Sequence, residues 1–302
     1  MKKVAFIALV LCLVLSANVF AAGAKESAGT TLGFAVSTLA NDFFVTMKEA
    51  GDAKAAEENV AMVTLDAQDS SELQADQVED LINRKVDLII LNPVNSDAIG
   101  AAVESANRAG IPVITVTRAA AFGDVIQHLD IDNKEAGQLV AQQMLKDLAK
   151  TGTVAVLEGI PGASSTNDRQ SGFLDTIKGS DIEMVTSLTA NYNREQGATV
   201  MEDILQGYPK LSAVYAHNDE MALGAARAID AAGLTGKIKV YGIDAVDDAI
   251  DAVKNGEMAA TVQQQPDLQM RMAIDAALKY LAGEKVEKLV NIPLKLITKA
   301  DL

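Results

Sequence analysis

Two kinds of hydrophobic pattern alternate along the chain. One is a run of consecutive apolar residues, as in TLGFAVS (Thr31–Ser37), VDLIILNP and IPVITVT. The other places apolar residues three to four positions apart, as in Asp42–Glu58, where Phe44, Met47 and Ala55 share one helical face. Continuous apolar strands between amphipathic helices are typical of parallel sheets buried on both faces. The pattern therefore predicts an α/β fold with doubly wound parallel sheets.

The number of predicted strands indicates more than one sheet. About ten apolar runs are too many for one ordinary doubly wound sheet, and an eight-stranded barrel is the alternative. An approximate internal repeat disfavours the barrel, because segments 86–118 and 211–244 share one order of strand, Asn, helix and strand. Asn92 precedes Arg118 by 26 residues, and Asn218 precedes Asp244 by the same distance. Two similar halves predict two similar domains that face each other.

The N-terminus carries the pattern of a cleavable secretory signal peptide, which we assign to residues 1–24. Two lysines precede the apolar stretch Val4–Leu15, and small residues allow cleavage after Ala21 or Ala24. A membrane anchor would need about 20 apolar residues. Lipid anchoring at Cys12 is an open alternative without support, because the preceding Leu11 is not small. The segment predicts a periplasmic location.

Composition narrows the function further. The net charge of −15 argues against nucleic acid as a partner, because phosphate binding needs a basic face. The single cysteine, Cys12, lies inside the predicted signal peptide, so the mature chain would have neither disulfides nor thiolate chemistry.

Candidate binding residues follow the predicted strands, because ligands of parallel α/β sheets bind at the carboxyl ends of the strands. The segments at these ends are STLANDFF, NPVN, TR, GIPGASSTNDR, ANYNR, HNDE, GID and QQQ. They contain arginines, a carboxylate, amides and aromatic rings. Such groups match a neutral, hydroxyl-rich small molecule, because hydroxyls both donate and accept hydrogen bonds.

No catalytic, cofactor or metal motif accompanies these residues, so we expect a protein that is not an enzyme and holds neither cofactor nor metal. GIPGASS lacks the lysine of a phosphate-binding loop. His128 and His217 are far apart in sequence, and structural roles are the favoured interpretation for both.

From about Thr30 to the C-terminus, the chain resembles periplasmic sugar-binding proteins of the ribose/galactose class, in particular the ribose-binding branch. The resemblance is carried by STLANDFF, NPVNSDAIGAAVESANRAGIPVIT, AHNDEMALGAARA, YGID and MAATVQQQP. It implies two α/β lobes joined by a three-crossing hinge, which close on a sugar and deliver it to an ATP-binding-cassette transporter. The implied lobes are 30–131 plus 265–293 and 132–264 plus 294–302. The crossings would lie near Asp130–Asn133, Gln263–Pro266 and Asn291–Leu294.

The resemblance also implies a set of ligand-binding residues. These are Asn41, Phe43, Phe44, Thr117, Arg118, Arg169, Tyr192, Asn218, Asp244 and Gln264. Thr117 is a departure, because ribose binders carry an aspartate there, and Tyr192 replaces a phenylalanine. Arg194 receives no such assignment and is interpreted as a loop or helix-start residue.

Structural roles remain open for several of these residues. Phe43 and Phe44 could belong to the core, and Arg118 could pair with a structural carboxylate. Asn218 and Asp244 could each cap a helix, and Gln264 could be a hinge residue without ligand contact. In the same way Arg169 could be solvated, Tyr192 exposed, Thr117 an ordinary strand residue, and Asn92 either a turn residue or a contact.

The expected function is capture of a small sugar, either a pentose such as ribose or a related polyol. Loss of the aspartate leaves Arg118 and Arg169 against Asp244 in the inferred site, which raises the alternative of an acidic sugar or a polyol other than ribose. The expected partners are a transporter permease and, as an open option, a chemoreceptor, with the protein itself a monomer. A sugar-responsive transcriptional regulator is a remote alternative, because the place of its helix-turn-helix is taken by the signal peptide.

Overall fold

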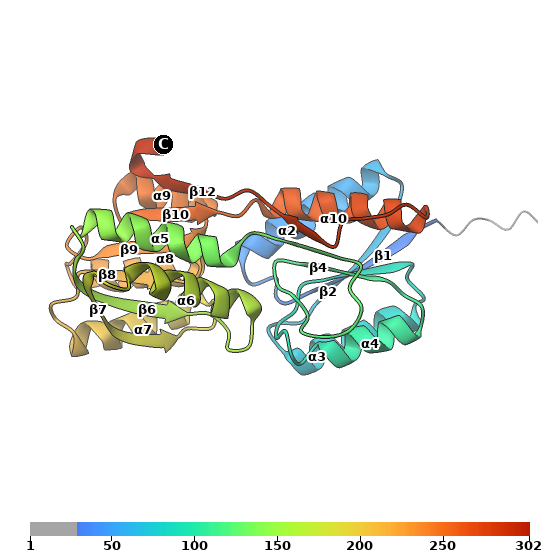
Figure 1. The fold of residues 1–302 in the computed structure, drawn as a ribbon, viewed down its shortest axis with the longest axis horizontal. Coiled ribbons are helices and arrows are strands. Elements are labelled where there is room, and N and C mark those ends of the chain that lie inside the picture. Colours follow the sequence, from blue (N-terminus) through green and yellow to red (C-terminus); the bar gives the residue numbers. More distant parts are fainter. Residues whose placement is uncertain (1–28) are drawn as a thin grey trace, which may run out of the picture. The chain divides into compact units, whose positions relative to one another are not determined.

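The computed structural model describes residues 29–302, and the predicted signal peptide lies outside the described residues. Within this part, the strands form two six-stranded sheets, each with helices on both faces (Figure 1). The eight-stranded barrel is therefore excluded, and the prediction of two doubly wound sheets is confirmed.

The first sheet is parallel throughout and has the strand order β11-β5-β4-β3-β1-β2. One face packs against α2 and α10, and the other packs against α3 and α4. The strands are β1 (Thr31–Val36), β2 (Ala61–Asp66), β3 (Leu88–Leu91), β4 (Val113–Val116), β5 (Gln127–Asp130) and β11 (Leu289–Asn291). The helices are α2 (Asp42–Glu57), α3 (Ser71–Asn83), α4 (Gly100–Arg108) and α10 (Pro266–Leu281).

The second sheet has the order β12-β10-β9-β8-β6-β7, and its edge strand β12 runs antiparallel to β10. This antiparallel edge is a difference from the expected all-parallel sheets. The strands are β6 (Thr151–Glu158), β7 (Asp181–Thr189), β8 (Ala213–Ala216), β9 (Lys239–Asp244), β10 (Ala260–Gln263) and β12 (Lys295–Thr298). The helices are α5 (Asn133–Asp147), α6 (Ser164–Ile177), α7 (Arg194–Gly207), α8 (Asp219–Ala231) and α9 (Asp247–Asn255), followed by the short η1 (Lys299–Asp301).

The two sheets repeat one arrangement, as the internal sequence repeat predicts. Asn92 follows β3 and Asn218 follows β8, and these strands occupy equivalent places in the two strand orders. In the same way Arg118 follows β4, and Asp244 ends β9. The repeat therefore brings the carboxyl ends of equivalent strands into one region of the molecule.

The chain passes between the sheets at three places. These are between Asp130 and Asn133, between Gln263 and Pro266, and between Asn291 and Lys295. Among residues 29–302, no helix is both long and apolar enough to span a membrane.

Candidate functional site

A small cavity lies where strand ends of the two sheets meet. Its volume is about 20 Å³, and none of its eleven lining side chains is more than 8% exposed. The lining consists of Asn41, Phe43, Phe44, Thr117, Arg118, Ser165, Arg169, Tyr192, Asn218, Asp244 and Gln264. The structure thus brings together all ten residues singled out from the sequence and adds Ser165. Their contact with a ligand stays a prediction.

The start of α2 presents two aromatic rings to the cavity. The Asn41 side chain caps this helix by accepting a hydrogen bond from the Phe43 amide at 2.9 Å. The rings of Phe43 and Phe44 then meet edge to face, with centroids 5.1 Å apart. Both phenylalanines also pack into the core of the first sheet, so their core role and their place in the cavity wall are compatible.

Arg118 is buried, and within residues 29–302 its guanidinium has no carboxylate at ion-pair distance. One nitrogen donates to the Pro93 carbonyl at 3.0 Å, whereas Nε has no partner among the described residues. The guanidinium lies 5.5 Å from the ring centre of Phe44 and 5.0 Å from that of Tyr192. Burial lowers the pKa of Arg118, and the charge of Asp69 acts against this shift. No pattern in the sequence points to Asp69, which lies in the loop after β2.

Arg169, in the second turn of α6, is buried rather than solvated. Its Nε donates to Asn133 Oδ1 at 2.8 Å, and another nitrogen donates to the His217 carbonyl. The guanidinium lies 5.9 Å from the ring centre of Tyr192. Two arginines therefore flank a single aromatic ring.

Tyr192 occupies the left-handed region of backbone space, with φ of 58°. Its ring packs against Gly159, where an added Cβ would lie 2.0 Å from the ring carbon Cζ. The hydroxyl makes hydrogen bonds with Ser165 Oγ at 2.9 Å and Thr166 Oγ1 at 3.0 Å. Ser165 was missed as an individual candidate, although it lies in the strand-end segment GIPGASSTNDR.

Asn218, Asp244 and Gln264 line the cavity from the second sheet. Asn218 caps α8 by accepting from the Met221 amide at 3.0 Å, and its amide nitrogen donates to the Tyr192 carbonyl at 3.3 Å. Gln264 donates to the Asp244 carboxylate, whereas Gln264 Oε1 has no partner in the described part of the chain. Asn218 therefore both caps α8 and lines the cavity.

Burial and the neighbouring Asp219 raise the pKa of Asp244 well above its usual range. Burial also raises the pKa of Asp219 to about 7, although hydrogen bonds from Thr261 and Val246 act to lower it. Burial and the adjacent Arg169 lower the pKa of His217 to about 3, so this imidazole is neutral. Asp219 and Asp244 thus hold protons more strongly than exposed carboxylates do.

Thr117 has a backbone φ of 65°, which is rare for a β-branched residue. It is therefore not an ordinary strand residue. Its hydroxyl donates to Gln269 Oε1 at 3.0 Å, and Gln269 Nε2 donates to the Gln264 carbonyl at 3.0 Å. All three side chains are buried.

Four residues discussed from the sequence lie outside the cavity wall. Asn92 accepts from the Ser37 amide and donates to the Val116 carbonyl, which is a structural role. Arg194 begins α7 and forms ion pairs with Glu220 and Asp248.

The two histidines make protein contacts. His128 forms a hydrogen bond with Thr115 at 2.9 Å, and His217 forms one with Gln170 at 3.0 Å. These contacts account for both imidazoles as structural groups.

Direct hydrogen bonds join loops of the two sheets beside the cavity. The Ser96 amide donates to the Gly162 carbonyl at 3.0 Å, and the Ser164 amide donates to Ser96 Oγ at 3.1 Å. The Ala119 amide donates to Ser164 Oγ at 3.1 Å. We call this set of bonds the loop bridge.

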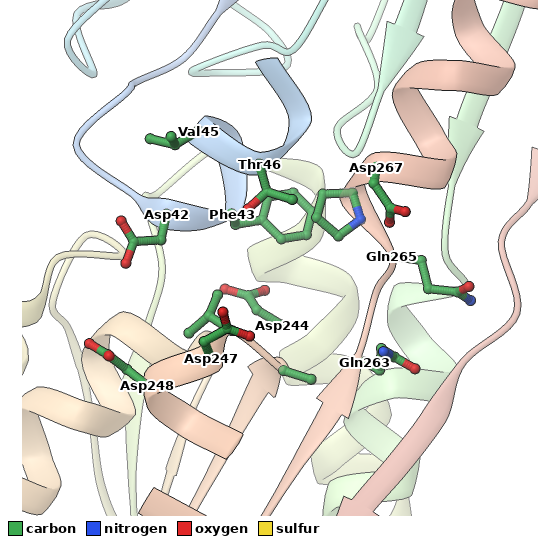
Figure 2. A pocket seen from close by; sticks show the side chains of 13 residues that line it. Asp42, Phe43, Val45, Thr46, Asp244, Asp247, Asp248, Gln263, Gln265 and Asp267 are labelled. Carbon is green, nitrogen blue, oxygen red and sulfur yellow. The ribbon is translucent and has the colours of Figure 1, made fainter. Parts of the chain in front are cut away.

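An acidic groove adjoins the cavity and shares Phe43 and Asp244 with it. In Figure 2 the start of α2 faces Asp244 and the start of α9 across this groove. Its lining includes the aspartates Asp42, Asp247, Asp248 and Asp267. The approach to the cavity from this side therefore carries negative charge.

Comparison with known proteins gives a consistent result. Residues 32–285 match the periplasmic binding protein domain family. The ribose import binding protein of Bacillus subtilis is 44% identical over 269 residues, which cover 89% of this chain and 87% of that protein. The xylitol-binding protein of Mycolicibacterium smegmatis is 32% identical and covers 88% of this chain and 78% of its own length.

Solved structures agree with these relatives. A transporter solute-binding protein from Bacillus halodurans with bound myo-inositol has a TM-score of 0.86 and 32% identity. It covers 92% of this chain and 97% of its own. With its two doubly wound sheets and its cavity between strand ends, this chain belongs to the periplasmic binding protein domain family.

Proposed function

We propose that this protein is an extracytoplasmic solute-binding protein that captures a small polyhydroxylated sugar and delivers it to an ATP-binding-cassette transporter. The ligand would be a pentose such as ribose or a related polyol. Relatives whose names specify ribose and xylitol, and a neighbour that holds myo-inositol, support this class of ligand.

The observation that carries the proposal is the unused hydrogen-bonding capacity of the cavity wall. Arg118 Nε and Gln264 Oε1 are buried without partners among the described residues. A buried polar group without a partner costs about 1–3 kcal/mol. A ligand hydroxyl can donate to Gln264 Oε1, another can accept from Arg118, and the rings of Phe43, Phe44 and Tyr192 can cover the apolar faces of a sugar.

Closure of two lobes would bring these residues around the ligand. We assign residues 30–131 plus 265–293 to the first lobe and 132–264 plus 294–302 to the second, with the hinge at the three passages between the sheets. Since the cavity wall is nearly closed to solvent, a ligand could enter only if the lobes separate.

The cellular setting follows from the same proposal. Residues 1–24 would direct export and be removed, which leaves a periplasmic monomer. The protein would present its closed form to the transporter permease, and a chemoreceptor could use the same form. Ligand capture would proceed without catalysis.

A sugar acid is the second candidate ligand. Two buried arginines line the cavity with a single carboxylate, and burial raises the pKa of that carboxylate. A ligand carboxylate would compensate the excess of positive charge.

Calorimetric titration with D-ribose, xylitol, erythritol and aldonates of the same carbon number tests the proposal. We expect saturable binding of at least one compound, together with a higher melting temperature and a smaller radius of gyration at saturation. The same titrations on Thr117→Asp would show whether this position sets the preference. Absence of binding to every compound would refute the proposed function, and an unchanged radius of gyration would refute closure.

A further inference from the structure

Gln269 lies outside the cavity wall, yet its side-chain amide fixes the orientation of a hydroxyl inside it. This glutamine, on α10, is fully buried and contacts both Thr117 and the Gln264 backbone. The Gln264 carbonyl can only accept a hydrogen bond, so the Gln269 NH₂ group must face it. Gln269 Oε1 is then left to face Thr117.

The orientation of the amide determines which way the Thr117 hydroxyl points its proton. Oε1 can only accept, so the hydroxyl proton is directed to Gln269. The lone pairs of Thr117 Oγ1 remain for the cavity. Thr117 therefore offers an acceptor to the ligand, which is the role that an aspartate oxygen would play at this position.

A hydrogen-bond acceptor at Thr117 favours a ligand that donates a hydroxyl over a ligand that presents a carboxylate. A ligand hydroxyl can donate to Thr117 Oγ1, whereas a ligand carboxylate has only lone pairs to present and would be repelled. The charge of the adjoining groove acts in the same direction, since Asp42, Asp247 and Asp267 in its lining are exposed and repel an anion.

We propose that Gln269 is a positioning residue for ligand selectivity: by holding Thr117 as an acceptor, it selects a neutral ligand that donates a hydroxyl here over a sugar carboxylate. This inference rests on the proposed function and narrows its ligand class. It acts through Thr117, because Gln269 does not line the cavity.

The test compares the affinities of neutral polyols and aldonates of equal carbon number by calorimetry. For the wild-type protein we expect the neutral compound to bind at least tenfold more tightly. In Gln269→Met the Thr117 hydroxyl loses its acceptor and can turn its proton toward the ligand, so the ratio of the two affinities should fall at least fivefold. Gln127→Met is the matched control, because Gln127 is also buried and donates to a backbone carbonyl, that of Glu287, away from the cavity. Its ratio should equal that of the wild type.

Two variants at Thr117 keep the test decisive if Gln269→Met does not fold. Thr117→Ser retains the hydroxyl and should retain the ratio, whereas Thr117→Val should lose it. In the Thr117→Val background, Gln269→Met should have no further effect on the ratio.

The outcomes separate the two proposals. Tighter binding of the aldonate by the wild type would overturn this inference and leave the proposed function intact. The inference would also be overturned if Gln269→Met or Thr117→Val had the same ratio of polyol to aldonate affinity as Gln127→Met. Binding of neither compound class would refute the proposed function, and this inference with it.

Discussion

Arg118 combines burial, an unpartnered Nε and two aromatic neighbours, and the last two features depend on a planar guanidinium. Lysine keeps the charge, but it cannot reproduce the fork of donors or the stacking geometry. The shape of the group therefore matters here as much as its charge.

Arg118→Lys is expected to weaken binding of the neutral ligand by roughly 30-fold or more, because a buried hydrogen-bonded charge contributes about 2–5 kcal/mol to binding. Calorimetric titration measures the effect. Arg84→Lys is the control, since Arg84 is exposed on the surface and pairs with Asp80. Equal affinities of the two variants would contradict a ligand-binding role for Arg118.

Asp219 makes stability depend on pH in a predictable direction. Because its folded-state pKa is raised to about 7 from an ordinary value near 4, the folded protein binds more protons than the unfolded chain between these values. The free energy of unfolding should therefore fall as pH rises from about 4 to about 7.

Asp219→Asn removes this titration and should flatten the pH profile relative to the wild type by an amount on the order of 1–2 kcal/mol. Urea unfolding of the ligand-free proteins at about pH 5 and about pH 7.5 measures the difference. Parallel profiles for the two proteins would show that Asp219 does not titrate in this range.

Some residue positions could be predicted from the sequence, and others could not. Arg118 and Asp244 lie at the carboxyl ends of apolar strands, and these ends converge in parallel sheets, so their meeting follows from the pattern. The bond between Thr117 and Gln269 spans 152 residues and joins a strand end to the buried side of a helix, which no local pattern indicates. The opposing charge of Asp69 likewise depends on the path of a loop.

At the level of elements, the apolar runs identified nine strands and missed three. β5 has the sequence QHLD, β11 has LVN and β12 has KLIT. These three strands are at most four residues long, and two of them lie at sheet edges, where polar residues are tolerated. Their pairing depends on neighbouring strands rather than on their own composition.

The turn after β6 offers a test of how an element positions the ligand site. In Gly159→Ala, the added methyl group would lie 2.0 Å from Tyr192 Cζ, so the ring must leave its place. We expect at least tenfold weaker binding of the neutral ligand, measured by calorimetry.

Gly207→Ala is the matched control, because no atom lies within 4 Å of the added Cβ in the last turn of α7. Alanine is favoured over glycine in helices by up to about 1 kcal/mol, so this variant should keep its affinity and its stability. Unchanged affinity in Gly159→Ala would show that the Tyr192 ring is not needed where it lies.

For the whole molecule, the loop bridge biases the equilibrium between the proposed open and closed states. Its bonds join loops of the two sheets and do not depend on a ligand. A larger closed fraction in the free protein raises the apparent affinity for every ligand alike.

Ser164→Ala removes the oxygen that accepts from the Ala119 amide. We expect a decrease in affinity of about two- to tenfold, equal for all bound sugars, from the loss of one hydrogen bond worth about 0.5–1.5 kcal/mol. Ser180→Ala is the control, because Ser180 lies between α6 and β7, bonds only to Ile177 and Ile182 among the described residues, and does not line the cavity. A change in ligand preference in Ser164→Ala would contradict a purely conformational role.

The loop bridge also affects how long a ligand stays bound. Its hydrogen bonds must break before a captured molecule can leave, whereas capture starts from the open state, in which they are absent. Weakening the bridge should therefore shorten the residence time of the sugar more than it slows capture, in line with the general dominance of dissociation rates in affinity. A permease that separates the two loops would release its cargo by breaking a few bonds that lie away from the sugar itself.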